Sequence, residues 1–124
     1  MGYTLIRADE REFVPVGDEG ARGIVRLSDA LRHSRANVWR YAPGARGRRH
    51  LESVQEEVFV VLEGSPTALL GDPPERVRLP RGSVVLLEPG TAVQIANDGG
   101  EDAVVLIVGA PPEPGKAEYL PDAE

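Results

Sequence analysis

Residues 44–64 of this chain, with the sequence GARGRRHLESVQEEVFVVLEG, decide its fold. A glycine stands at each end, and between them lie one histidine, several glutamates and a run of consecutive apolar residues, Val58 to Leu62. Successive side chains of a strand point to opposite faces, so Glu57, Phe59 and Val61 share one face of a predicted strand. The sequence therefore places a carboxylate and an aromatic ring in one predicted interior, an arrangement typical of small-molecule sites.

The remainder of the chain repeats this strand-like pattern. Short runs rich in valine, isoleucine and leucine alternate with turns rich in glycine and proline, and no helical period stands out. The sequence predicts an all-β sandwich or barrel with mostly antiparallel pairing. Ser28 to His33 form either one helical turn capped by Ser28 or a loop. The predicted strands are Tyr3 to Ile6, Arg22 to Leu27, Ala36 to Ala42, Glu56 to Leu62, Pro66 to Leu70, Arg76 to Leu79, Ser83 to Leu87, Val93 to Ala96 and Ala103 to Val108.

Length and composition indicate one small domain. The 124 residues, of which 41% are hydrophobic, support a single core. We assign residues 1–110 to one barrel and residues 111–124 to a proline-rich acidic tail held by Tyr119 and Leu120. The chain has no apolar run of about 20 residues and a polar beginning, so we expect a cytoplasmic protein without a membrane partner.

The charge pattern limits the partners. A formal net charge of -6 argues against nucleic acid, whose partners usually present a basic face. We interpret the basic cluster Arg46, Arg48 and Arg49 as a solvated loop in preference to an anion-binding site. The chain has no cysteine, so any metal would be held by imidazole and carboxylate groups.

Two glycine-anchored segments carry a resemblance to a known family. The first cupin motif has two histidines, a glutamate and two glycines at fixed spacing, and Gly44, His50, Glu57 and Gly64 match it. Glu52 stands where that motif has its second histidine.

The second segment matches the second cupin motif in part. Gly82, Gly90 and Asn97 are in register with it, while Glu88 replaces its proline and Val93 its histidine. The chain thus resembles a small single-domain cupin with a degenerate metal motif. The resemblance implies a double-stranded β-helix, which is a jelly-roll barrel.

The resemblance also implies a set of site residues. In cupins the positions of His50, Glu52, Glu57 and Val93 ordinarily give three imidazoles and one carboxylate to a divalent metal. Valine cannot ligate, so the candidate ligands are His50, Glu52 and Glu57, and the candidate cofactor is one Mn, Fe, Mg or Zn ion. Replacing imidazole with carboxylate favours harder ions over copper and nickel.

The same three residues have two interpretations without a metal. Glu52 and Glu57 form a carboxylate pair near His50, and such a pair would share one proton and could act as a general acid or base. Alternatively, a protonated His50 pairs with both acids as a structural cluster. His50, Glu52 and Glu57 are therefore also the catalytic candidates.

Other polar and aromatic residues receive structural interpretations. His33 is predicted to lie at the surface. Trp39 and Tyr41 share one face of a strand, and they line the cavity only if that face points inward. We interpret Trp39 as a core or dimer-interface residue, and Asn97 as a partner of turn backbone groups.

Three functions follow as hypotheses. The first is a barrel that binds a small polar molecule, with a weakened or absent metal site. The second is a divalent-metal-dependent enzyme, a dioxygenase or isomerase, that uses His50, Glu52 and Glu57. The third is a structural or regulatory dimer without a pocket ligand. We expect a homodimer, because the edge strands of a small barrel need covering.

Overall fold

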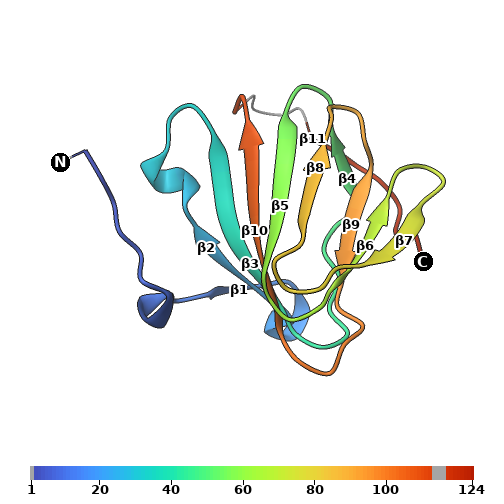
Figure 1. The fold of residues 1–124 in the computed structure, drawn as a ribbon, viewed down its shortest axis with the longest axis horizontal. Coiled ribbons are helices and arrows are strands. Elements are labelled where there is room, and N and C mark those ends of the chain that lie inside the picture. Colours follow the sequence, from blue (N-terminus) through green and yellow to red (C-terminus); the bar gives the residue numbers. More distant parts are fainter. Residues whose placement is uncertain (1, 113–116) are drawn as a thin grey trace.

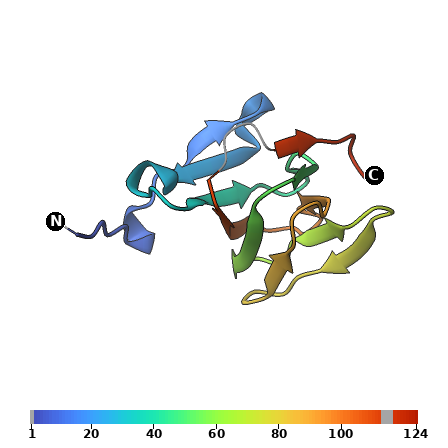
Figure 2. The ribbon, with the colours of Figure 1, turned by 90° about the horizontal axis from the view of Figure 1, so that it is seen from above.

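Two facing antiparallel sheets make up the protein, as described for residues 2–112 and 117–124 by a computed structural model (Figure 1). Seen from above, the sheets lie opposite each other (Figure 2). The all-β prediction is confirmed. The six-stranded sheet has the order β1 (Val14–Val16), β2 (Arg22–Arg26), β3 (Arg35–Tyr41), β10 (Ala103–Ala110), β5 (Glu56–Glu63) and β8 (Val84–Leu87). The five-stranded sheet has the order β11 (Ala117–Tyr119), β4 (His50–Glu52), β9 (Val93–Ala96), β6 (Thr67–Leu70) and β7 (Glu75–Arg78).

Eight of the nine predicted strands are present, each within two residues of its predicted ends. The prediction of a strand from Tyr3 to Ile6 is wrong. Residues 2–7 pair with no strand among the described residues, and Tyr3 and Leu5 are exposed. An apolar alternation becomes a strand only where a neighbouring strand supplies backbone partners. The sheet begins instead at β1, which pairs with β2.

The described residues include three short 3₁₀ helices. The first, η1 (Ala8–Glu10), precedes β1, while η2 (Asp18–Gly20) joins β1 to β2 and η3 (Ser28–Ala30) joins β2 to β3. The turn predicted at Ser28 is thus present, but its predicted cap is wrong. The Ser28 hydroxyl donates to the Ala36 carbonyl at 3.1 Å and accepts from the Ala36 amide at 2.9 Å. Ser28 therefore joins the turn to the start of β3 and does not cap a helix.

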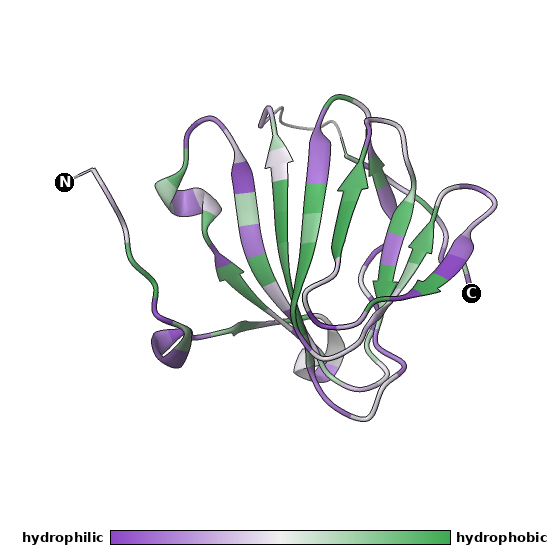
Figure 3. Cartoon of the chain, in the orientation of Figure 1, coloured by the Kyte–Doolittle hydropathy of each residue, from purple (hydrophilic) through white to green (hydrophobic). Residues whose placement is uncertain are grey.

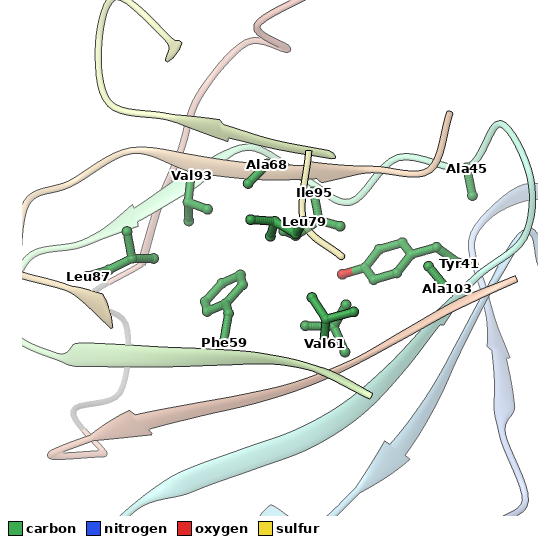
Figure 4. Packing of buried hydrophobic residues seen from close by; sticks show 11 residues of the cluster. Tyr41, Ala45, Phe59, Val61, Ala68, Leu79, Leu87, Val93, Ile95 and Ala103 are labelled. Atoms are coloured by element: carbon green, nitrogen blue, oxygen red, sulfur yellow. The ribbon is translucent and has the colours of Figure 1, made fainter. Parts of the chain in front are cut away.

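The hydrophobic core lies between the two sheets (Figure 4). The alternation predicted for β5 is confirmed, because Phe59 and Val61 are 2% and 1% exposed while Val58 and Val60 are half-buried. Phe59 and Val61 face Val93 and other side chains of the five-stranded sheet (Figure 4). This packing holds the two sheets together and fixes β5, whose second residue is the motif carboxylate Glu57.

The outer face of the six-stranded sheet is also apolar. Val58 on β5 pairs with Leu86 on one side and with Val108 on the other, which puts aliphatic side chains in register across three strands. The strands β5, β8 and β10 accordingly show hydrophobic colours in Figure 3. Val84 and Leu86 on the edge strand β8 are 55% and 74% exposed. This face offers a surface for the expected homodimer.

The C-terminal segment is attached to the barrel at Tyr119 and Leu120, the two residues expected to hold it. Tyr119 pairs with His50 where β11 runs along β4, and the Leu120 amide donates to the Arg49 carbonyl at 2.9 Å. The side-chain amide of Gln94 donates to the Asp122 carboxylate at 3.0 Å. The segment after residue 116 therefore adds the edge strand β11 to the five-stranded sheet. No helix in the described part of the chain has the length and apolar character needed to cross a bilayer.

Candidate metal and ligand site

The short connection from β4 to β5, which crosses from one sheet to the other, brings the three predicted site residues together. His50 and Glu52 lie two apart on β4, and Glu57 follows after a tight turn at the start of β5 in the facing sheet. One potential ligand atom from each lies within 4.8 Å of the other two. His50 Nε2 is 3.2 Å from Glu57 Oε1, and Glu52 and Glu57 are each only 7% exposed. The cluster combines one imidazole with two buried carboxyl groups.

The environment raises the pKa of two members of this cluster. Burial alone would lower the pKa of His50, but the hydrogen bond and the charge of Glu57 outweigh it, so the pKa is raised. Burial raises the pKa of the Glu52 carboxyl, and the nearby Glu57 charge adds to this effect. Both groups therefore retain a proton at higher pH than they would in water. This agrees with a proton shared in the cluster and with a protonated His50 paired with acids.

Two buried polar atoms, one in the cluster and one next to it, lack a hydrogen-bond partner among the described residues. Glu52 Oε1 and Gln55 Nε2 form no hydrogen bond within the described residues. Such groups are rare in folded proteins, because an unpaired buried group loses its hydration without compensation. A ligand, an ion or water in the cavity would satisfy them.

Gln55 was missed by the sequence reasoning. It lies in the turn between β4 and β5, is 3% exposed and lines the cavity. A Cβ atom at position 109 would lie 2.6 Å from Gln55 Oε1, so Gly109 on β10 leaves room for this side chain. The only available sequence signal was an amide two residues before the motif glutamate, and nothing in the pattern says that it points inward.

Aromatic side chains form a wall of the cavity, whose volume is about 340 Å³. Trp39 and Tyr41 both line it, and their rings stack with centroids 6.3 Å apart. The inward face of β3 is therefore the aromatic one. Trp39 also packs against the core, so its interpretation as a core residue holds together with a place in the cavity wall. A volume in this range suits a small molecule.

The fourth ligand position of the metal motif is occupied by a side chain that cannot bind a metal. Val93 is 1% exposed, pairs with His50 across β9 and β4, and packs in the apolar cluster near Phe59 and Leu87 (Figure 4). One nitrogen and two carboxylates remain, and one of the carboxylate oxygens is the unpartnered Glu52 Oε1. This donor set fits one divalent cation with three protein ligands and further positions open.

The structural interpretations of two other residues are confirmed. Asn97 Nδ2 donates to the Tyr41 and Glu101 carbonyls, both at 2.8 Å, and its Oδ1 accepts from the Gly99 amide at 3.0 Å. Asn97 therefore serves the turn backbone. His33 is exposed, as predicted.

Comparison with known proteins gives one family and many structural relatives. The sequence pattern of the cupin domain family matches residues 37–109. No curated protein matches this chain in sequence. An uncharacterized conserved protein with a double-stranded β-helix domain from Klebsiella pneumoniae superposes with a TM-score of 0.79 at 20% identity, over 97% of this chain and 99% of its own.

Two further structures have higher identity. A protein from Acidithiobacillus ferrooxidans, provisionally described as a sugar phosphate isomerase, is 27% identical with a TM-score of 0.72, over 97% of this chain and 88% of its own. A sugar phosphate isomerase of the cupin superfamily from Silicibacter pomeroyi is also 27% identical, with a TM-score of 0.67 over 73% of this chain. This chain spans only 59% of that protein's length.

Proposed function

Because this chain belongs to the cupin family, we propose that its barrel binds a small polar molecule in the cavity next to His50, Glu52 and Glu57. The observation that carries the proposal is the pair of unpartnered buried groups, Glu52 Oε1 and Gln55 Nε2. One is a hydrogen-bond acceptor when ionised and the other is a donor, and both belong to residues that line a cavity of about 340 Å³. A few polar groups converging on an aromatic-walled cavity are typical of ligand sites.

The residues that would hold a metal ion in this proposal are His50, Glu52 and Glu57. With three protein ligands and no imidazole at position 93, we expect weak affinity for a divalent cation. A bound ion would act as a Lewis acid toward an oxygen of the ligand. Glu57 would also orient the imidazole through the hydrogen bond to His50 Nε2 in the metal-free protein.

A second candidate function is a divalent-metal-dependent enzyme, and the clustering of three potential ligands supports it. Two relatives at 27% identity are described as sugar phosphate isomerases, one of them provisionally. Isomerisation needs a group that takes and returns a proton, and a carboxyl with a raised pKa, such as Glu52, suits that role. Dioxygenase chemistry has less support, because the usual two-histidine, one-carboxylate ligand set is absent.

A thermal-shift screen of small polar metabolites tests the proposed function. A ligand at 100 times its dissociation constant raises the free energy of unfolding by about 2.7 kcal/mol. We expect hits with the wild-type protein that weaken or vanish in Gln55→Leu. The proposal is wrong if no compound stabilises the wild type, or if every hit acts equally on Gln55→Leu.

Elemental analysis of protein purified without chelator separates the two candidates. Near one metal ion per chain in the wild type, lost in both Glu57→Gln and Glu52→Ala, would favour the enzyme. Hits in the thermal screen with chelator-treated protein would favour the metal-independent binding barrel.

A further inference from the structure

The cavity lining carries more positive than negative charge. Among the described residues, Arg22, Arg35 and Arg48 line it together with two carboxylates, Glu52 and Glu57, whereas the whole chain has a net charge of -6. None of the three arginines forms an ion pair with any of the described acidic side chains, which do not include that of Asp18. Guanidinium groups left unpaired beside a cavity favour an anionic ligand.

The three arginines differ in what they face. Arg35 is close enough to Glu52 to favour the charged form of that carboxyl. The positive charge of Arg35 is therefore partly compensated from within the cavity. Arg22 and Arg48 remain available to a ligand.

Arg22 on β2 is held in place by its surroundings. Its guanidinium carbon lies 5.5 Å from the centre of the Trp39 ring, within the range of a cation–π interaction. On another side, a Cβ atom at Gly17 would lie 3.2 Å from Arg22 Nη2, so the glycine leaves room for the guanidinium. Arg22 is half-buried, which limits the solvent screening of its charge.

Arg48 contributes charge from the opposite sheet. It precedes β4, and its guanidinium carbon lies 3.5 Å from the centre of the Tyr119 ring on β11. Tyr119 also lines the cavity and pairs with His50. Arg22 and Arg48 therefore come from the two facing sheets and flank the same cavity.

Neutral polar groups in the cavity indicate a second property of the ligand. Asn37 Oδ1 on β3 and Gln55 Nε2 are buried without a hydrogen-bond partner in the described part of the chain, and both residues line the cavity. One group accepts and the other donates. A hydroxyl group can donate to the first and accept from the second, so hydroxyls suit both.

We propose that the ligand is a small hydroxylated organic anion, with its carboxylate or phosphate group bound by Arg22 and Arg48 and its hydroxyls near Asn37 and Gln55. This inference rests on the proposed function, because it names the chemical class of the molecule that the cavity binds. A cavity of about 340 Å³ holds a molecule of this kind. The shared chemistry is an oxyanion on a hydroxylated carbon chain.

Three probes of similar size test the inference by NMR of ¹⁵N-labelled protein: D-gluconate, D-glucose 6-phosphate and neutral D-glucitol. The indole N–H of Trp39 and the side-chain amide of Gln55 report on binding. We expect at least one anion to shift both signals and to bind about 10- to 100-fold more tightly than D-glucitol, the range of a hydrogen bond to a charged group. Preference for gluconate or for the phosphate ester identifies the acid group.

Substitutions of arginine on β2 provide the matched controls. Arg22→Met should weaken binding of the preferred anion about 10-fold or more, and Arg22→Lys, which keeps the charge but loses the planar fork, should weaken it less. Arg26→Met on the same strand, at an exposed position outside the cavity, should leave binding unchanged. Urea unfolding of each variant establishes that it is folded.

The outcomes separate this inference from the proposed function. If D-glucitol binds as tightly as the anions, or if Arg22→Met is folded and binds as well as Arg26→Met, the inference is wrong and the cavity still binds a polar molecule. If no probe shifts any cavity signal at millimolar concentration while the thermal-shift screen gives hits that weaken in Gln55→Leu, the inference is wrong and the proposed function stands. If neither experiment detects binding, both are wrong.

Discussion

Replacing Glu52 with methionine should stabilise the protein while damaging the candidate site. The Glu52 side chain is 7% exposed, and its Oε1 has no hydrogen-bond partner in the described residues. A buried polar group without a partner costs about 1–3 kcal/mol. Methionine fills a similar volume without that group and adapts to irregular packing. We therefore expect the free energy of unfolding to rise by about 1–3 kcal/mol.

Urea unfolding of metal-free protein measures the change, with the slope of the transition expected to stay constant. Glu56→Met is the matched control, because Glu56 is exposed at the start of β5 and its replacement should change stability by less than about 0.5 kcal/mol. The pKa of Glu52 is raised in the folded protein. The wild type therefore loses stability as pH rises from the ordinary carboxyl range through that raised pKa, and the advantage of Glu52→Met should grow over the same interval.

A loss of stability would refute this reasoning. If Glu52→Met lowers the free energy of unfolding by more than about 1 kcal/mol while Glu56→Met has no effect, Glu52 stabilises the fold. We would then interpret Glu52 as part of a structural cluster with His50 and not as part of a ligand site.

Four further predictions concern the histidine, a motif glycine and the outer face. Glu57→Gln should lower the pKa of His50, because it removes the carboxylate whose effect on that pKa exceeds the opposite effect of burial. An NMR pH titration checks this, with the exposed second histidine as reference. An unchanged pKa of His50 would contradict the prediction. Since that pKa is raised, the stability contributed by His50 should be full below its ordinary pKa and lost as pH rises through the raised value, which unfolding at several pH values measures. Gly64→Ala should lower the free energy of unfolding by about 1–3 kcal/mol more than Gly44→Ala does. Both glycines have positive φ, but a Cβ at Gly64 would lie 2.6 Å from a backbone carbonyl oxygen, whereas a Cβ at Gly44 meets nothing within 4 Å. Equal losses of stability on chemical unfolding would show that the backbone around Gly64 adjusts, and would contradict the prediction. We expect the wild type to form a homodimer through the outer face that includes Leu86, and Leu86→Glu to reduce its hydrodynamic size; a wild type that is monomeric at all concentrations excludes this.

The strands could be predicted because their pattern is local. β5 contains a short apolar run, and burial alternates along it from Glu57 to Val61 because successive side chains of a strand point to opposite faces. Residues 3–6 show a similar local pattern, but no strand lies beside them among the described residues. Pairing is a property of the fold, and a single segment does not reveal it.

The candidate site was predictable only where residues close together in the sequence supply it. The spacing of His50, Glu52 and Glu57 is set by β4, a tight turn and β5, so local geometry brings them together. Their role as metal ligands stays a prediction. Arg22 and Tyr119 come from β2 and β11, far apart in the sequence, and reach the cavity through sheet pairing that no local pattern specifies.

The basic cluster shows the same limitation. Arg48 was interpreted as part of a solvated loop, and it is exposed, yet it also lines the cavity through its contact with Tyr119. Arg49, by contrast, is buried and donates to the Gly71 and Pro121 carbonyls, both at 3.3 Å. Of these two neighbouring arginines just before β4, Arg48 therefore lines the cavity and Arg49 binds backbone carbonyls.

The side-chain amide of Gln55 offers the most direct test of the central claim that this cavity is a ligand site. We would follow its ¹⁵N NMR signals while mixtures of small polar metabolites are added to the wild type and to Glu52→Met. The account predicts that at least one compound shifts the Gln55 amide and the Trp39 indole together in the wild type, with weaker binding in the variant. Signals that stay unchanged with every compound, or that shift equally in both proteins, would contradict it.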